Sequence, residues 1–141
     1  MPVLATETVT TTAGREGRST SADGKINLAQ SPPGSNGPGT NPEQLFAAGY
    51  SACFGGAIGA AAAMSKVPLK GADIKVTATV HLNKDDSGYF IDAVLDCELS
   101  GLQQSQAAEL VAKAHTICPY SKATKGNIKV ELRANGEAVK G

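Results

Sequence analysis

The chain has 141 residues, a length that fits one domain with a core of its own and no disulfide or metal support. Its 13 basic and 13 acidic residues cancel and the pI is near 6.7, so no overall positive field attracts nucleic acid or an anionic membrane. Three cysteines are too few for a secreted disulfide framework, and the N-terminal residues lack a basic segment followed by an apolar one. We therefore expect a cytoplasmic protein with a single domain spanning residues 1–141.

Three extended segments are expected near the start of the chain. The Thr- and Val-rich residues 3–12 predict a strand, and the turn-forming sequence GREG follows at 14–17. A second extended piece runs to the Asp-Gly dipeptide at 23–24, and KINLAQ at 25–30 predicts a third strand. Residues 31–39 hold three Pro and three Gly, which favours a surface loop.

A long helix is expected next, because its start carries three helix-initiating residues in a row. Asn41 is a good N-cap, Pro42 suits the first helical position, and the helix dipole favours the negative charge of Glu43. The helix is predicted to run to about Lys66, since the residue before Pro68 disfavours helical geometry.

Most of this helix is uncharged. The 20 residues from Leu45 to Met64 carry no charge, which is about the length that a bilayer requires. Eight Ala and four Gly make the segment only weakly apolar, however. This composition favours a soluble helix closely surrounded by other elements, and no membrane partner is expected.

The second half of the chain predicts a hairpin, a helix and a strand. Apolar residues alternate with polar ones over 74–82 and again over 91–99, and a turn at 84–88 would join these two strands. Apolar residues then recur at helical spacing over 103–118, where a following proline ends the helix, and 128–133 alternate as a last strand. This order predicts an α+β fold with antiparallel sheet.

The three cysteines differ in their surroundings. Cys53 lies in the uncharged helix, where a thiol is either a small buried hydrophobe or a nucleophile, and a reactive thiol needs positive charge and access nearby. Cys97 belongs to the apolar register of its strand, so we expect a core residue. Cys118 stands beside a proline at a chain reversal, where it either caps the core or is accessible to a second site.

A metal site lacks ligands. His115 and Cys118 share a helix face, but zinc requires three or four N or S ligands and His81 points away from the apolar face of its strand. Phosphate-binding loops and a GxSxG elbow are also missing from the sequence. We expect no metal or cofactor, and by elimination any chemistry is thiol chemistry.

Two long motifs, GTNPEQLFAAGYSACF at 39–54 and AHTICPYSKATKGNI at 114–128, closely resemble the organic hydroperoxide resistance proteins (Ohr) of the Ohr/OsmC family. The similarity covers nearly the whole chain, including the GREG turn. It implies antiparallel sheets around a long central helix in an intertwined homodimer. The chain departs from the pattern at Ala13, where a glycine is common, and in the high Gly and Ala content after Cys53.

The resemblance implies a thiol peroxidase. In this family the position matched by Cys53 is the peroxidatic cysteine, Cys118 matches the resolving one, Arg15 matches an activating arginine, and Glu43 matches the carboxylate that holds this arginine. A guanidinium within about 4 to 6 Å lowers a thiol pKa by about 1 to 3 units, which increases the reactive thiolate. From the residues alone, Arg18 is an equal candidate for this charge.

The spacing of two matched residues suggests a shared site. Glu43 and Cys53 are ten residues apart on one predicted helix, which places them about 15 Å apart along its axis. We therefore hypothesise that Arg15 and Glu43 serve the Cys53 of a second subunit. Close approach of two such helices would use four small residues, Gly49, Gly55, Gly56 and Gly59.

The family further implies organic hydroperoxides, including those of fatty acids, as substrates and a lipoyl group on a carrier protein as the reductant. Two alternatives remain open. The chain could belong to the OsmC branch, with the same chemistry and a different peroxide preference. It could instead be a non-catalytic dimer that binds an apolar ligand and holds inert cysteines.

Overall fold

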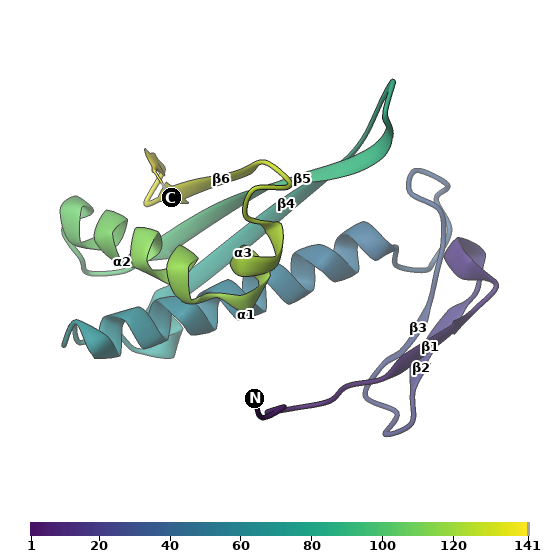
Figure 1. The fold of residues 1–141 in the computed structure, drawn as a ribbon, viewed down its shortest axis with the longest axis horizontal. Helices are drawn as coiled ribbons and strands as arrows, with labels where there is room; N and C mark the ends of the chain where they lie inside the picture. Colours follow the sequence, from purple (N-terminus) through teal and green to yellow (C-terminus); the bar gives the residue numbers. More distant parts are fainter. Residues whose placement is uncertain (141) are drawn as a thin grey trace. The chain divides into compact units, whose positions relative to one another are not determined.

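The computed structural model describes residues 1–140 (Figure 1). It divides into an N-terminal unit, residues 1–45, and a C-terminal unit that begins at Phe46. Each unit is described by itself. The expectation of one domain over residues 1–141 stays a prediction.

The N-terminal unit is a small antiparallel sheet in the order β1-β2-β3. Its elements are β1 (Val9–Thr12), the 3₁₀ turn η1 (Gly14–Glu16), β2 (Arg18–Ser21) and β3 (Asn27–Ala29). The three predicted extended segments are therefore confirmed, although the first begins only at Val9. The segment 31–39 holds no helix or strand, as its Pro and Gly content predicts.

Helix α1 (Pro42–Met64) begins where the sequence predicts. The Asn41 side-chain oxygen accepts a hydrogen bond from the Gln44 N–H at 2.8 Å, and Pro42 is the first helical residue. Within residues 1–140, α1 is also the helix long and apolar enough to cross a membrane, by length and composition only. One such helix is weak evidence, since the core helix of a soluble protein passes the same test.

The C-terminal unit contains a four-stranded sheet in the order β4-β5-β6-β7, with helices in the chain between β5 and β6. Its elements are η2 (Gly71–Asp73), β4 (Ile74–Asp85), β5 (Gly88–Leu99), α2 (Gln104–Ile117), α3 (Pro119–Thr124), β6 (Val130–Ala134) and β7 (Glu137–Val139). The predicted hairpin is confirmed, with Ile74 opposite Leu99 and Leu82 opposite Ile91.

One strand pair departs from the predicted antiparallel sheet. β6 pairs in parallel with β5, because α2 and α3 form a crossover that returns the chain in the same direction. The short α3 and β7 were not predicted. Pro119 does end α2, as expected, but a proline also suits the first position of a helix, and α3 starts at that residue.

The core lies on one face of this sheet, where α1, α2 and α3 pack against the strands (Figure 1). Alternate residues of β5 point into it, and Cys97 is among them, buried as predicted. The largest fully buried side chains all belong to this unit: Tyr50, Phe54, Ile58, Leu95, Leu99 and Val111, with Cys97, Cys118 and Ser121.

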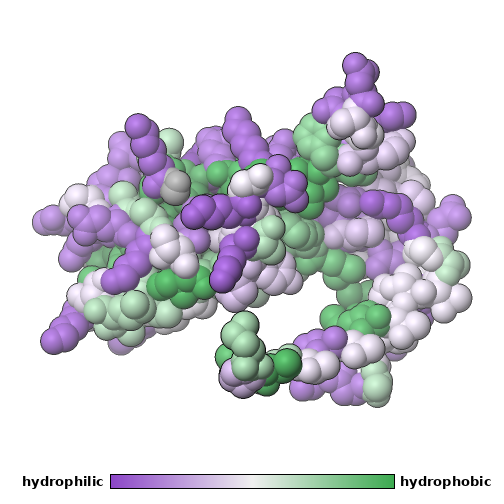
Figure 2. Space-filling model, in the orientation of Figure 1, coloured by the Kyte–Doolittle hydropathy of each residue, from purple (hydrophilic) through white to green (hydrophobic). Residues whose placement is uncertain are grey.

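The two units differ in their surfaces (Figure 2). Pale tones, typical of Thr, Ser and Gly, prevail over the N-terminal unit, in which the buried side chains are the polar Ser19 and Gln30. In the C-terminal unit the end of the β4–β5 hairpin carries hydrophilic side chains, and the ammonium group of Lys84 lies 5.1 Å from the Tyr89 ring centre. Among residues 1–140, the apolar core therefore lies in the C-terminal unit, and residues 1–45 bury no apolar side chain.

Candidate active site

Cys53 and Cys118 meet inside the C-terminal unit. Their Sγ atoms lie 3.3 Å apart, although the residues are 65 positions apart in the chain. Both thiols are free; Cys53 is half-buried, whereas Cys118 is only 1% exposed. A disulfide is about 2.05 Å long, so the sulfurs need to approach by a little over 1 Å to form one. Cys118 packs against the core, as one of its two interpretations predicts, and the group that it contacts there is the Cys53 thiol.

The local sequence explains the position of Cys118. Its N–H closes the last turn of α2 by donating to the Ala114 carbonyl at 2.9 Å, and its own backbone is extended, with φ −63° and ψ 123°. Pro119 then starts α3 directly. Cys118 is therefore the single non-helical residue between two helices, and the bend at this residue leaves its side chain against α1.

The surroundings of Cys53 within this unit disfavour the thiolate. Burial raises the pKa of the Cys53 thiol above its ordinary value, and the neighbouring Cys118 raises it further, while a hydrogen bond from the backbone N–H of Tyr120 lowers it. A reactive Cys53 therefore requires a positive charge that its immediate neighbours do not supply.

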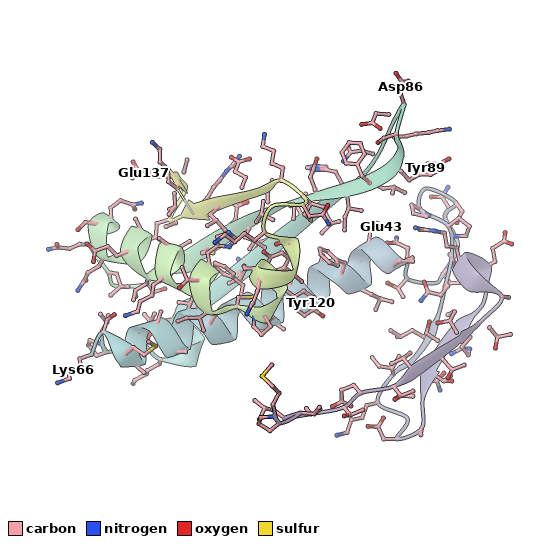
Figure 3. All side chains as sticks on the ribbon, viewed as in Figure 1. Glu43, Lys66, Asp86, Tyr89, Tyr120 and Glu137 are labelled. Atoms are coloured by element: carbon pink, nitrogen blue, oxygen red, sulfur yellow. The ribbon has the colours of Figure 1, made fainter. Side chains whose placement is uncertain are left out.

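Tyr120 lies against α1 (Figure 3), and its backbone N–H donates to Cys53. Its ring centre lies 5.6 Å from that of Tyr50 and 6.0 Å from that of Phe46. It rests on Gly49, where an added Cβ atom would collide with the Tyr120 ring and hydroxyl. Gly49 therefore has a contact within the chain, and its part in helix approach in a dimer stays a prediction.

The other glycines of α1 have more free space around them than Gly49. A Cβ atom at Gly56 would meet nothing within 4 Å, and those at Gly55 and Gly59 would make only ordinary contacts with β4 side chains. Together with Leu69 and Ile74, these glycines line an open hollow on the surface of the C-terminal unit. This face of α1 therefore has room for a close neighbour.

Arg15 and Glu43 form a two-pronged ion pair within the N-terminal unit. The Arg15 guanidinium donates to both Glu43 carboxylate oxygens, at 2.8 and 3.1 Å. These hydrogen bonds hold the pKa of Glu43 below its ordinary value and raise the pKa of Arg15. The rival Arg18 donates instead to the Asn27 side chain at 2.6 Å. Arg15 thus has the carboxylate partner that the resemblance implies, while the catalytic roles of both residues stay predictions.

The C-terminal unit also holds a cluster of hydrogen-bonded side chains that the sequence does not predict. The Ser121 hydroxyl lies 2.9 Å from the Tyr50 hydroxyl and 2.8 Å from His115 Nδ1, and the Tyr50 hydroxyl also lies 3.2 Å from the Thr124 hydroxyl. Burial, followed by the charge of Lys125, lowers the pKa of His115. The sequence offered no signal for Tyr50, whose apolar neighbours mark it only as a core residue.

His115 is also the histidine that shares a helix face with Cys118, the pair that falls short of a metal site in the sequence. Residues 1–140 contain no group of three or more His, Cys, Asp or Glu side chains that could hold a metal ion. Nδ1 of His115 is hydrogen-bonded to the Ser121 hydroxyl. Its observed contact is therefore a hydrogen bond to a hydroxyl group.

Known proteins are similar to this chain in sequence and in fold. The chain is 45% identical over 134 residues to the organic hydroperoxide resistance protein of Xanthomonas axonopodis pv. citri, covering 92% of this chain and 94% of the relative. It is 44% identical to the organic hydroperoxide resistance protein OhrA of Bacillus subtilis, with the same coverage. The crystal structure of Bacillus subtilis OhrB aligns with a TM-score of 0.87 at 42% identity, covering 93% of this chain and 98% of that one. Because residues 34–133 also match the family model described as OsmC-like protein, the chain belongs to the OsmC-like family.

Proposed function

We propose that this protein acts in organic hydroperoxide resistance as a thiol peroxidase, with Cys53 as the nucleophile and Cys118 as the resolving thiol. The observation that carries the proposal is the 3.3 Å separation of the two sulfurs, one half-buried and one buried. The Cys53 thiolate attacks one peroxide oxygen and breaks the O–O bond; the alcohol leaves after protonation, and Cys53 becomes a sulfenic acid. Cys118 then condenses with this sulfenic acid and releases water.

Arg15 supplies the activating charge in this proposal. Burial raises the Cys53 pKa, so the attack at neutral pH needs a cation nearby. The Arg15 guanidinium is 45% exposed, and Glu43 fixes its orientation through two hydrogen bonds. An exposed, oriented guanidinium is suited to a thiolate that approaches from outside the N-terminal unit.

We further propose that the thiolate belongs to a second copy of the chain in a homodimer. Ten residues of helix separate Glu43 from Cys53, about 15 Å of rise. α1 also exposes a row of small residues at four-residue spacing, Ala48, Ala52, Gly56 and Ala60, against which another chain can pack closely. The N-terminal unit buries no apolar side chain by itself, which is a further reason to expect a partner.

The proposed substrates are organic hydroperoxides, including those of fatty acids, and the proposed reductant is a dihydrolipoyl group on a carrier protein. Tyr120, whose backbone N–H bonds to Cys53, is partly exposed, and its ring centre lies 6.0 Å from that of the partly buried Phe46; this apolar surface suits an organic substrate better than hydrogen peroxide. The reductant attacks the Cys53–Cys118 disulfide and leaves as the lipoyl disulfide, so two electrons reach each peroxide. The proposed location is the cytoplasm.

The first test measures consumption of cumene hydroperoxide with dihydrolipoamide by the native chain, Cys53→Ser and Cys118→Ser. We expect no turnover from Cys53→Ser. Cys118→Ser should react once and then accumulate sulfinic acid, detected as a gain of two oxygen atoms by mass spectrometry. Unchanged turnover in Cys53→Ser would remove the mechanism, and a faster reaction with hydrogen peroxide would favour the other branch of the family.

The second test asks whether the site is shared between copies. Arg15→Ala and Cys53→Ser chains are each expected to be inactive or slow. A dimer with one chain of each kind would contain one site with an intact Arg15 and an intact Cys53, so mixing after unfolding and refolding should restore activity. No restoration, with mixed dimers shown by native mass spectrometry, would place each site within a single chain.

A further inference from the structure

We propose that the hydrogen bond between Tyr50 and Ser121 is a clamp that sets the distance between the two sulfurs. Tyr50 and Ser121 are then positioning residues for the step that joins Cys53 to Cys118. The catalytic consequence rests on the proposed function, but the geometric claim does not. It can be tested by any oxidant that converts two thiols to a disulfide.

The clamp runs parallel to the sulfur pair. Tyr50 precedes Cys53 by three residues on α1, and Ser121 follows Cys118 by three residues in the first turn of α3. One contact therefore joins Tyr50 to Ser121 at 2.9 Å, and a second joins Cys53 to Cys118 at 3.3 Å. The two contacts lie about one helical turn apart. Because both ends of each contact lie on the same two segments, the hydroxyl pair limits how far α3 can move along or away from α1.

Donors and acceptors in this cluster support one another. A tyrosine or serine hydroxyl has a single proton to donate, and Tyr50 contacts both Ser121 and Thr124. If Thr124 donates to the Ser121 carbonyl at 3.1 Å, Tyr50 donates to Thr124, Ser121 donates to Tyr50, and His115 Nδ1–H donates to Ser121. The reverse orientation would direct the Thr124 proton at Tyr50 and lose the hydrogen bond from Thr124 to the Ser121 carbonyl. Ser121 thus has a partner on each of two other helices, which fixes its position closely.

Burial makes the clamp stiff. Tyr50 and Ser121 are 0% and 1% exposed, so water cannot readily replace a lost partner. The rings of Phe46 and Tyr120 both pack against the Tyr50 ring, with ring centres 5.8 and 5.6 Å from that of Tyr50, and restrict how this side chain can move. The sulfur pair, by contrast, is held by a weak thiol contact, beside which Cys53 accepts a hydrogen bond from the backbone N–H of Tyr120. The Tyr50–Ser121 hydrogen bond therefore controls the distance between the Cys53 and Cys118 sulfurs.

The controlled step is the closure of the disulfide. A peroxide-oxidised Cys53 carries –SOH; the Cys118 sulfur attacks the Cys53 sulfur, the S–O bond breaks, and the hydroxide leaves as water with the Cys118 proton. Well-oriented groups gain a large effective concentration, and a misplacement of about 1 Å costs about a hundredfold in rate. Loss of the clamp should therefore slow closure, while the first attack on peroxide, which needs only Cys53, changes little.

The geometric test uses glutathione and no peroxide. Native chain, Tyr50→Phe and Ser121→Ala are equilibrated with mixtures of glutathione and glutathione disulfide, and the effective concentration of the thiol pair is obtained from the fraction with a Cys53–Cys118 disulfide. We expect a loss of roughly 10- to 100-fold in each variant. Ser51→Ala is the matched control, because its hydroxyl on α1 bonds only to the Ala48 carbonyl, and it should equal the native chain. Equal values in all four proteins would overturn the clamp.

The double variant Tyr50→Phe/Ser121→Ala removes both hydroxyls of the clamp together, so neither is left facing the other's vacancy, and Thr124 keeps its bond to the carbonyl of residue 121 while His115 Nδ1 loses its hydroxyl partner. It keeps the test available if a single variant fails to fold. It should show the same loss of effective concentration, and a native value in a folded double variant would also overturn the clamp. In stopped-flow oxidation with cumene hydroperoxide, the clamp predicts a nearly native first phase, slow closure and more sulfinic acid. If the native chain consumes no peroxide, the proposed function fails, yet the glutathione result still decides the clamp.

Discussion

The N-terminal and C-terminal units hold complementary halves of the proposed chemistry in opposite physical settings. The C-terminal unit places two sulfurs in a packed apolar core, where burial raises the Cys53 pKa. The N-terminal unit has no apolar core and presents an exposed guanidinium oriented by the carboxylate of Glu43. The comparison teaches that the nucleophile and its activating charge need different environments, since the surroundings that shield a sulfur also penalise its ionised form.

The largest expected effect tests the difference in packing. Leu95→Ala removes a side chain that is fully buried in the core of the C-terminal unit, and should lower the free energy of unfolding by about 2 to 5 kcal/mol. Val9→Ala removes an apolar side chain in the N-terminal unit that is 51% exposed, and should change the free energy of unfolding by less than about 0.5 kcal/mol. Urea denaturation measures both. A loss at Val9 as large as that at Leu95 would show that the N-terminal sheet is covered by a partner in solution.

Cys97 tests what burial alone does to a thiol. Its pKa is raised to about 12, mainly by burial and further by the nearby Asp96, so it should stay neutral at every pH that the fold tolerates. Against an ordinary thiol pKa of 9.0, this shift lowers its thiolate fraction near neutral pH roughly a thousandfold. Iodoacetamide at pH 8 should therefore leave Cys97 unmodified in the Cys53→Ser/Cys118→Ser variant. Rapid labelling in the native fold would contradict the burial argument.

Arg15 tests whether the two units cooperate. Removing a cation near a thiolate raises the thiol pKa, so Arg15→Ala should shift the pH profile of Cys53 alkylation to higher pH by about 1 to 3 units. Reactivity at pH 7 should fall about tenfold or more. Arg18→Ala is the matched control, because Arg18 is bonded to Asn27 and should leave the profile unchanged. The opposite pattern would assign the activating charge to Arg18.

Much of the fold could be predicted because its signals are local. Alternating residues marked the β4–β5 hairpin, and Asn41-Pro42 marked the start of α1. The parallel pairing of β6 with β5 could not be predicted, since it depends on how a crossover packs and not on the pattern within either strand. Pro119 shows a second limit, because one residue both ends a helix and begins the next.

The candidate site likewise has parts that could be predicted and parts that could not. The resemblance indicated Cys53, Cys118, Arg15 and Glu43, and the structure pairs the sulfurs with each other and the charges with each other. The hydrogen bond from Tyr50 to Ser121 joins residues 71 positions apart, and no local pattern encodes such a contact. The spacing argument likewise could not reveal that Gly49 accommodates the Tyr120 ring.

The smallest expected effect concerns the turn that carries Arg15. Ala13 has φ 61° and ψ 25°, and Gly14 has φ 54°, so two consecutive residues are left-handed before the arginine. This conformation costs an L-residue about 1 to 2 kcal/mol, whereas glycine adopts it freely. Ala13→Gly relieves that strain but loosens the unfolded chain by about 0.4 to 1 kcal/mol, so a net stabilisation below about 1 kcal/mol is expected.

Gly14→Ala, at the neighbouring position, should change the stability of the turn in the opposite direction. A Cβ atom there would meet nothing within 4 Å, so its whole effect comes from the backbone, and it should destabilise the turn by about 1 kcal/mol. Hydrogen exchange of the Gly17 amide, which donates to the Gly14 carbonyl, measures the turn directly. Slower exchange in Ala13→Gly with faster exchange in Gly14→Ala would show that the N-terminal unit stores backbone strain beside its guanidinium. Changes of the same sign would mean that the turn relaxes out of the left-handed region in solution.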